Sequence, residues 1–316
     1  MQHRRRTASR GRGTVGQVGL GIMGGAFAKH LLAAGFNVVG YDPSHRAAAV
    51  LKRAGGEPVP SAAAVAARTR VIITSLPSPA AMEAAFFGKE GIAAGARPGT
   101  AVIEASTMTL ELKERIRRHL ARQDVHLLDC PISGTGAQAA AKDIIVYASG
   151  DRGAFNRCRK VFNGFARGTY YCGEFGTGSK LKFVANLLVT IHNLSTAEAM
   201  VVGEKAGLDL RLLYKVIGDG AGSSRMFQVR GPLMVAGNYL PPHMKSEIYQ
   251  KDIDIIDGFA RRLRCPTPLF SGSLPFYTAA LRQGWGKHDT AAIHAVLRKR
   301  AGLQGRPRRR ITRKGK

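Results

Sequence analysis

A glycine-rich turn between a strand and a helix constrains this chain more than any other feature. Residues 14–20, TVGQVGL, form a short apolar run, and apolar residues at helical spacing follow the turn in AFAKHLLAAG, residues 26–35. In a GxGxxG turn the glycines allow a tight bend, close approach of a phosphate and close packing of helix on strand. The helix N-terminus adds free N–H groups, so the pattern predicts a phosphate-binding turn. Its residues are Gly19, Leu20, Gly21, Ile22, Met23 and Gly24.

An acidic residue ends the next predicted strand. Residues 36–41, FNVVGY, predict that strand, and Asp42 follows it about 20 residues after the glycines. A carboxylate at this position accepts hydrogen bonds from adenosine ribose hydroxyls and repels a 2′-phosphate, so we expect NAD as cofactor, with NADP less favoured. His45 and Arg46 weaken that preference. The alternative is that Asp42 is the N-cap of the helix that follows.

Strands and helices then continue to alternate. The segments 71–76, 100–105 and 125–130 are typical of buried strands, and the segments 80–87 and 110–121 have helical spacing. Such alternation predicts an α/β fold with a Rossmann-like, doubly wound parallel sheet. Ligands of these sheets lie outside the carboxyl ends of the strands. Three loops that we expect at those ends contain Leu76-Pro77, Thr107 and Ser133-Gly134-Thr135.

The Ser-Gly-Thr-Gly turn after the strand 125–130 is the most informative of these loops. It offers backbone N–H groups and two hydroxyls, which together form a neutral cradle for a carboxylate. The alternative is an ordinary turn at the start of the helix that begins AQAAA.

The second half of the sequence has an all-helical pattern. A long apolar segment, 179–207, predicts a helix of about 28 residues, roughly 42 Å long. Further helices are expected near 209–218, 223–236, 244–263, 271–283 and 288–300. We therefore divide the chain into a basic tail (1–13), an NAD(P)-binding domain (14–176), an all-helical domain (177–300) and a second basic tail (301–316).

Two polar residues share one stripe of the long apolar helix. At 3.6 residues per turn, Lys182 and Asn186 lie on the same face as Asn193 and Thr196, whereas Lys180 points to the opposite side. A buried Lys needs a partner or a task, so the stripe is a candidate for catalysis. The alternative is a Lys that snorkels at the helix start and an Asn bonded to a nearby loop.

The basic charge of +27 is concentrated at the two ends of the chain. Residues 1–12 contain five Arg, and residues 298–316 contain ten basic and no acidic residues. Such blocks are usually solvated ends, and the alternative is a nucleic-acid or polyanion contact, although the tails contain almost no aromatic residues to stack on bases.

The composition also bears on membranes, metals and location. No apolar run reaches the roughly 18 residues of a membrane span, so we expect no membrane contact. The four cysteines form no CxxC pair, which favours reduced thiols in the cytoplasm and no metal site.

Four segments are similar to motifs of one family, the β-hydroxyacid dehydrogenases, which include 3-hydroxyisobutyrate dehydrogenase. They are GLGIMG (19–24), DCPISGTGAQ (129–138), GTGSKLKFVAN (176–186) and KD (251–252). The second resembles D-x-P-x-S-G-G-x-x-G-A, with Thr135 in place of the second glycine of the Gly-Gly pair. Ala185 stands where many members have Asn. Residues 220–239 are most similar to the L-threonate dehydrogenase branch.

The resemblance implies a helical domain like the C-terminal domain of 6-phosphogluconate dehydrogenase. The apolar faces of the long helix 179–207 favour a homodimer or homotetramer. It implies hydride transfer from a short hydroxy acid, 3-hydroxyisobutyrate-like or threonate-like, to NAD⁺, with Lys182 as general acid/base. Ser133, Gly134 and Thr135 would hold the substrate carboxylate, and Asn186 would orient the substrate hydroxyl or the Lys. The cofactor would be lined by Leu76, Pro77, Thr107 and Lys251. The alternative is an NADPH-dependent reductase of small aldehyde acids, such as glyoxylate or succinic or tartronate semialdehyde.

Overall fold

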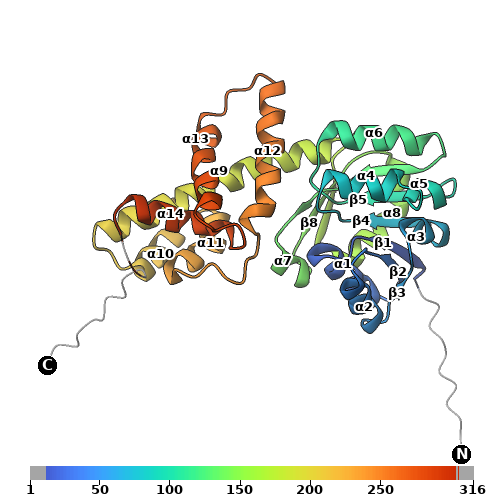
Figure 1. Cartoon of the computed structure of the whole chain (residues 1–316), viewed down its shortest axis with the longest axis horizontal. Helices are drawn as coiled ribbons and strands as arrows, with labels where there is room; N and C mark the ends of the chain where they lie inside the picture. The colour runs from blue at the N-terminus through green and yellow to red at the C-terminus, as the bar shows by residue number, and fades with distance from the viewer. Residues whose placement is uncertain (1–11, 304, 306–316) are drawn as a thin grey trace, which may run out of the picture. The chain divides into compact units, whose positions relative to one another are not determined.

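The computed structural model describes residues 12–303 and 305 (Figure 1). Both predicted basic tails lie mostly outside the described residues. The predicted solvated ends, and the alternative of a nucleic-acid or polyanion contact, therefore stay predictions. The chain forms two compact units, residues 1–182 and 183–316. The domain boundaries predicted at residues 13, 176 and 300 stay predictions.

The first unit is built on a six-stranded, fully parallel sheet with the strand order β3-β2-β1-β4-β5-β6. This is the order of a Rossmann fold, in which the direction of winding reverses between β1 and β4. The predicted α/β class is therefore confirmed. The strands are β1 (Thr14–Val18), β2 (Asn37–Tyr41), β3 (Glu57–Pro58), β4 (Val71–Thr74), β5 (Ala101–Glu104) and β6 (His126–Asp129).

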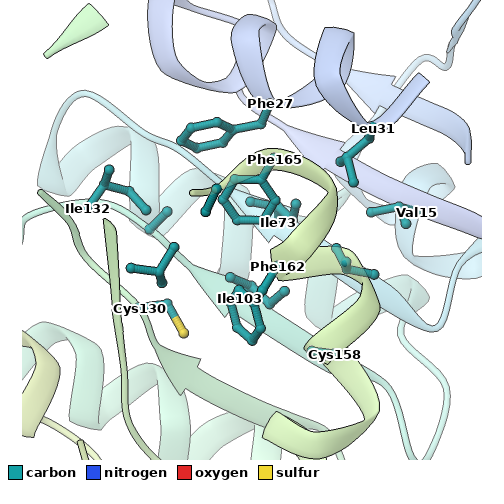
Figure 2. Close-up of a cluster of buried hydrophobic side chains, with 14 of the residues drawn as sticks. Val15, Phe27, Leu31, Ile73, Ile103, Cys130, Ile132, Cys158, Phe162 and Phe165 are labelled. Atoms are coloured by element: carbon teal, nitrogen blue, oxygen red, sulfur yellow. The ribbon is translucent and has the colours of Figure 1, made fainter. Parts of the chain in front are cut away.

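Helices cover both faces of this sheet because its strands are apolar on both sides. Ile72 and Ile73 are neighbours in β4 and both fully buried, and they belong to two different core clusters. Figure 2 shows the first cluster, where the rings of Phe27 and Phe165 pack with their centroids 4.7 Å apart. Its helices are α1 (Ile22–Ala33), α2 (His45–Arg53) and α8 (Arg152–Phe165), and those of the second cluster are α3 (Ala62–Arg68), α4 (Pro79–Phe87), α5 (Ile92–Gly95) and α6 (Leu110–Ala121).

A second, three-stranded sheet adjoins the end of β6. It consists of β7 (Ile132–Ser133), β8 (Ile145–Ala148) and β9 (Gly168–Tyr171), with β7 antiparallel and β9 parallel to β8. The short helix α7 (Gly136–Ala140) connects β7 to β8, and a bridge between Asp129 and Ser149 joins β8 to the end of β6. The small sheet therefore places Ser133 just beyond the carboxyl end of β6.

The helix α9 (Thr177–Lys205) has 29 residues and continues into the second unit, which is all-helical as predicted. Ser224 accepts a hydrogen bond from the N–H of Phe227 and so caps α11. Within the described residues, no helix is both long and apolar enough to cross a membrane. The remaining elements are α10 (Leu210–Gly218), α11 (Arg225–Ala236), α12 (Ser246–Arg262), α13 (Pro268–Arg282), η1 (Thr290–Ala292) and α14 (Ile293–Arg300).

A buried histidine makes the second unit sensitive to acid. His294 is fully buried, and its Nδ1 lies 3.0 Å from the hydroxyl of Tyr239. Burial, helped by the nearby Arg298 charge, lowers the pKa of His294 from 6.5 to about 4. The ring of Tyr239 packs edge-on against Trp285, the single tryptophan of the chain, so the indole reports on this cluster.

We expect the free energy of unfolding of the second unit to fall as the pH drops from about 6.5 to 4. In this range the unfolded state binds a proton at His294 and the folded state does not, which costs the folded state about 3 kcal/mol by pH 4. Urea titrations followed by Trp285 fluorescence at several pH values measure this loss. His294→Gln should flatten the pH dependence, and the exposed His45→Gln should not. Equal pH dependence in His294→Gln and the unaltered chain would contradict the prediction.

Candidate active site

The glycine-rich turn lies where the sheet reverses its winding. Gly19 has φ +85°, and a Cβ atom there would stand 2.2 Å from the carbonyl oxygen of Ser75, at the end of β4. A Cβ on Gly24 would stand 1.9 Å from the carbonyl oxygen of Gly19. A Cβ on Gly21 would meet nothing within 4 Å. Gly19 and Gly24 are thus required by packing, whereas the space beside Gly21 is open.

The N-terminus of α1 faces this open space without a cap from a side chain. Gly21 is its N-cap residue, no side chain accepts a hydrogen bond there, and the first turn contains no acidic residue. Helix N-termini of this kind favour phosphate through their N–H groups and the helix dipole. Ile22, at the start of α1, is 70% exposed. The residues Gly19–Gly24 therefore fit the pyrophosphate of a dinucleotide.

Asp42 connects this turn to the end of β2. Its Oδ2 accepts a hydrogen bond from the N–H of Leu20 at 2.7 Å, and its Oδ1 accepts one from the N–H of Ser44 at 2.8 Å. Ser44, not Asp42, caps α2, so the N-cap alternative for Asp42 is wrong. A carboxylate offers about four lone-pair sites, so Asp42 retains capacity for a ribose hydroxyl.

The loops after β4 and β5 are joined by one hydrogen bond. The N–H of Leu76 donates to the Oγ of Ser106 at 2.9 Å, and the Leu76 side chain lies beside Gly19. Pro77 follows Leu76 and is exposed, and Thr107 follows Ser106. The structure thus brings the predicted cofactor-lining residues of the first unit to the ends of β1, β4 and β5.

A fully buried lysine, which sequence reasoning missed, holds the ends of β5 and β6 together. The Nζ of Lys113 lies 2.6 Å from the carboxylate of Glu104 and 2.7 Å from that of Asp129, and it donates to the carbonyl of Ser106 at 2.7 Å. Burial alone would lower the pKa of Lys113, but the two carboxylates outweigh that effect and raise the pKa above its usual value. Lys113 is therefore a permanent buried cation.

Asp129 also caps the helix that carries Lys182. Its Oδ2 accepts a hydrogen bond from the N–H of Ser179 at 2.7 Å, and its Oδ1 accepts one from the Ser179 hydroxyl at 2.7 Å. The N–H of Gly178 donates to the Ser149 hydroxyl at 3.0 Å. The first N–H groups of α9 thus find partners from outside the helix, which fixes its first turn. Lys182 follows Ser179 after three residues and is half-buried.

The predicted carboxylate cradle adjoins the glycine-rich turn. Gly136 packs against Ile22, because a Cβ on this glycine would lie 2.5 Å from the Cγ2 of Ile22. Gly134 has φ +145°, a conformation that L side chains rarely adopt. Thr135 is the N-cap of α7, so the alternative of a turn at the start of a helix does describe this residue. Thr135 therefore caps α7, and the carboxylate site at Ser133, Gly134 and Thr135 stays a prediction.

In the second unit the structure brings Asn186 and Lys251 together through Asp252. The Asn186 side chain is almost fully buried and donates to the Oδ2 of Asp252 at 3.0 Å, and the Nζ of Lys251 donates to its Oδ1 at 2.8 Å. Asn193 is buried inside this unit and donates hydrogen bonds to the Tyr277 hydroxyl and to the backbone carbonyl of Thr290. The described residues contain no group of three or more His, Cys, Asp or Glu placed to hold a metal ion.

Comparison with known proteins defines the class. Residues 14–173 match the family described as the NAD binding domain of 6-phosphogluconate dehydrogenase, and residues 176–297 match the NAD-binding domain of NADP-dependent 3-hydroxyisobutyrate dehydrogenase. L-threonate dehydrogenase from Escherichia coli is 36% identical over 285 residues, covering 90% of this chain and 94% of that protein. The fold, the glycine-rich turn and these matches define an oxidoreductase with an NAD-type cofactor.

Solved structures of similar proteins point to the same class. 3-Hydroxyisobutyrate dehydrogenase from Salmonella typhimurium is 33% identical with a TM-score of 0.82, and the Mycobacterium tuberculosis 3-hydroxyisobutyrate dehydrogenase, solved with L-serine, is 27% identical with a TM-score of 0.81. Each match covers 90% of this chain and 99% of the other. The chain belongs to the β-hydroxyacid dehydrogenase family, related to 3-hydroxyisobutyrate dehydrogenase, as its sequence motifs predicted.

Lys113→Met should lower the free energy of unfolding by about 3–5 kcal/mol, because it leaves Glu104 and Asp129 buried without a cation. Urea unfolding at neutral pH measures the loss. Arg68→Met is the matched control, since it removes the Arg68–Glu57 ion pair, whose side chains are 47% and 56% exposed. Exposed pairs contribute little, so this control should change stability far less. Similar losses in both variants would show that Lys113 has no special role.

Proposed function

We propose that the chain oxidises the alcohol group of a short hydroxy acid with NAD⁺ as its cofactor. The observation that carries this proposal is the juxtaposition of the uncapped glycine-rich turn, residues 19–24, with the Ser133–Gly136 segment, which together offer sites for a pyrophosphate and a carboxylate. The similarity to L-threonate dehydrogenases supports a polar four-carbon sugar acid as substrate.

The first unit supplies most of the groups that would bind the cofactor. The N–H groups at the start of α1 suit the pyrophosphate, and Asp42 suits the ribose. Leu76, Pro77 and Thr107 belong to the strand-end loops, where such cofactors are lined, and Lys251 is assigned to the same role by its motif. When bound, NAD⁺ supplies the hydride acceptor. The carboxylate of the substrate is assigned to the Ser133–Thr135 segment.

Lys182 is the proposed acid/base. Oxidation of an alcohol requires loss of the hydroxyl proton, and a neutral amine at the Nζ of Lys182 would accept it. In the reverse direction the ammonium returns the proton to the carbonyl oxygen. Asn186 lies four residues on and orients the reacting groups without adding charge. The Asp129 cap on Ser179 holds the turn from which Lys182 projects.

NADP is the second candidate cofactor, because residues 176–297 match a family described by an NADP-dependent enzyme. It would accompany the reductive alternative, in which small aldehyde acids are substrates. The carboxylate of Asp42, at the end of β2, opposes a 2′-phosphate by like charge. This opposition is the reason that we propose NAD.

The assembly and location of the protein are part of the proposal. Large apolar side chains of the second unit are well exposed, among them Val184, Leu188 and Val202 on α9. A second copy of the chain that covers them would give the expected homodimer or homotetramer, which sedimentation equilibrium measures. The four cysteines are free thiols, in keeping with the cytoplasmic location that we propose and that fractionation of the source cells tests.

A spectrophotometric screen tests the function directly. NADH formation should appear with at least one of threonate, 3-hydroxyisobutyrate, glycerate, tartronate and 3-hydroxypropionate, and threonate should be among the best. The rate with NAD⁺ should exceed that with NADP⁺. Activity only with NADPH and aldehyde acids would favour the reductase instead, and no turnover in either direction would refute the proposed function.

Lys182→Ala should lower kcat by at least about 10²-fold, because the step loses its proton acceptor. The dissociation constant of NAD⁺, followed by calorimetry, should stay nearly unchanged. Lys180→Ala is the matched control, since Lys180 is exposed two positions earlier on the same helix. Full activity in Lys182→Ala, or an equal loss in Lys180→Ala, would contradict the assigned role.

A further inference from the structure

Gln138 occupies the hydrogen-bond donors of Thr135. The N–H of Thr135 donates to the Oε1 of Gln138 at 3.0 Å, and the Thr135 hydroxyl lies 3.3 Å from the same oxygen. In return, the N–H of Gln138 donates to the Thr135 hydroxyl oxygen at 3.4 Å. The two residues thus form a reciprocal capping box at the start of α7.

A second contact fixes the orientation of the Gln138 carboxamide. Its Nε2 faces the Oδ2 of Asp143 at 3.4 Å, and Asp143 is paired with Arg167 at 2.7 Å. A flipped carboxamide would place its oxygen against this carboxylate and its NH₂ group against the N–H of Thr135. Both contacts therefore favour the orientation with Oε1 on Thr135.

The pair stands within the segment assigned to the substrate carboxylate. Thr135 and Gln138 both replace glycines of the D-x-P-x-S-G-G-x-x-G-A pattern. A glycine at position 138 has no side chain that could accept a hydrogen bond from the N–H of residue 135. Gly136, between them, packs against Ile22 of the glycine-rich turn. Gln138 and Thr135 are each half-buried, so solvent and small ligands reach them.

We propose that Gln138 is a specificity-determining residue that competes with the substrate carboxylate for the donors of Thr135. The inference rests on the proposed function, because it assumes that the Ser133–Thr135 segment receives a carboxylate. The N–H of Thr135 already donates a hydrogen bond to the Gln138 carboxamide oxygen. This hydrogen bond must break before the N–H can donate to a substrate carboxylate. Gln138 therefore weakens the binding of the substrate carboxylate, and its effect appears in KM more than in kcat.

Two substitutions of Gln138 test the proposal in opposite directions. Gln138→Ala frees the N–H of Thr135 and should lower the KM of the hydroxy acid severalfold. Gln138→Glu keeps a capping box, since Glu serves in this motif as well as Gln, but places a negative charge beside the donors. It should raise KM by about tenfold or more through like-charge repulsion, while the KM of NAD⁺ stays unchanged.

The measurements use the full chain with the best substrate among the five hydroxy acids. The dissociation constant of that acid, measured by calorimetry, should follow KM in both variants. Gln123→Glu is the matched control, because it adds the same charge at an exposed position after α6 and should leave KM unchanged. The rise in KM for Gln138→Glu should shrink at high ionic strength, which a purely structural defect would not do.

The outcomes separate this inference from the proposed function. If the unaltered chain oxidises none of the five acids, the proposed function itself fails. If it does oxidise one, and both Gln138 variants raise KM alike, then Gln138 only supports α7 and the proposal is overturned. Unchanged KM in both variants overturns it as well. Opposite shifts, with Gln123→Glu unaffected, support it.

Discussion

The ammonium group of Lys113 is the contact on which the arrangement of the first unit depends. It joins the carboxylates of Glu104 and Asp129, which stand at the ends of neighbouring strands and would otherwise repel each other in the interior. Each carboxylate then makes a further contact, Glu104 with the N–H of Ser106 and Asp129 with Ser179. One cation thereby fixes both the loop after β5 and the first turn of α9.

The energetic meaning of this network differs from that of a surface ion pair. Desolvation of buried charges offsets much of their attraction, so an intact buried pair adds little net stability compared with apolar packing. What the network supplies is geometric definition, because every buried charge must find its partners in one arrangement. We infer that it specifies where α9 starts, and hence where Lys182 projects.

Much of the fold followed from local sequence patterns. The boundaries of α6 and the positions of β1, β2 and β4 are readable because apolar periodicity and Gly punctuation act within a few residues. β3 and α3 were missed in a stretch rich in Ala, Gly and Pro, where periodicity is weak. The pairing of β7, β8 and β9 into a separate sheet depends on partners outside each segment, so no local pattern reveals it.

The candidate site was predictable to a lesser degree, for two physical reasons. The partners of Asp129 lie 16, 20 and 50 residues away in the sequence, so no local window reveals them. Lys113 shares a helix face with Ile116 and Leu120, a signal that sequence reasoning overlooked because Lys is normally exposed. The capping role of Thr135 was foreseen only as an alternative. The ribose-binding role of Asp42 stays a prediction, and the hydrogen bond that its Oδ2 accepts from the N–H of Leu20 is visible only in three dimensions.

The three glycines of the glycine-rich turn differ in what requires them to be glycine. Gly19 and Gly24 are demanded by backbone atoms of the protein itself, whereas Gly21 borders open space. Selection for folding alone would therefore preserve Gly19 and Gly24, but it would not preserve Gly21. A descendant of this chain that lost catalysis would keep its fold and would accept substitutions at Gly21 before substitutions at Gly19 or Gly24. Under the proposed function, a side chain at position 21 of a relative would therefore indicate a protein that kept the fold but lost the dinucleotide.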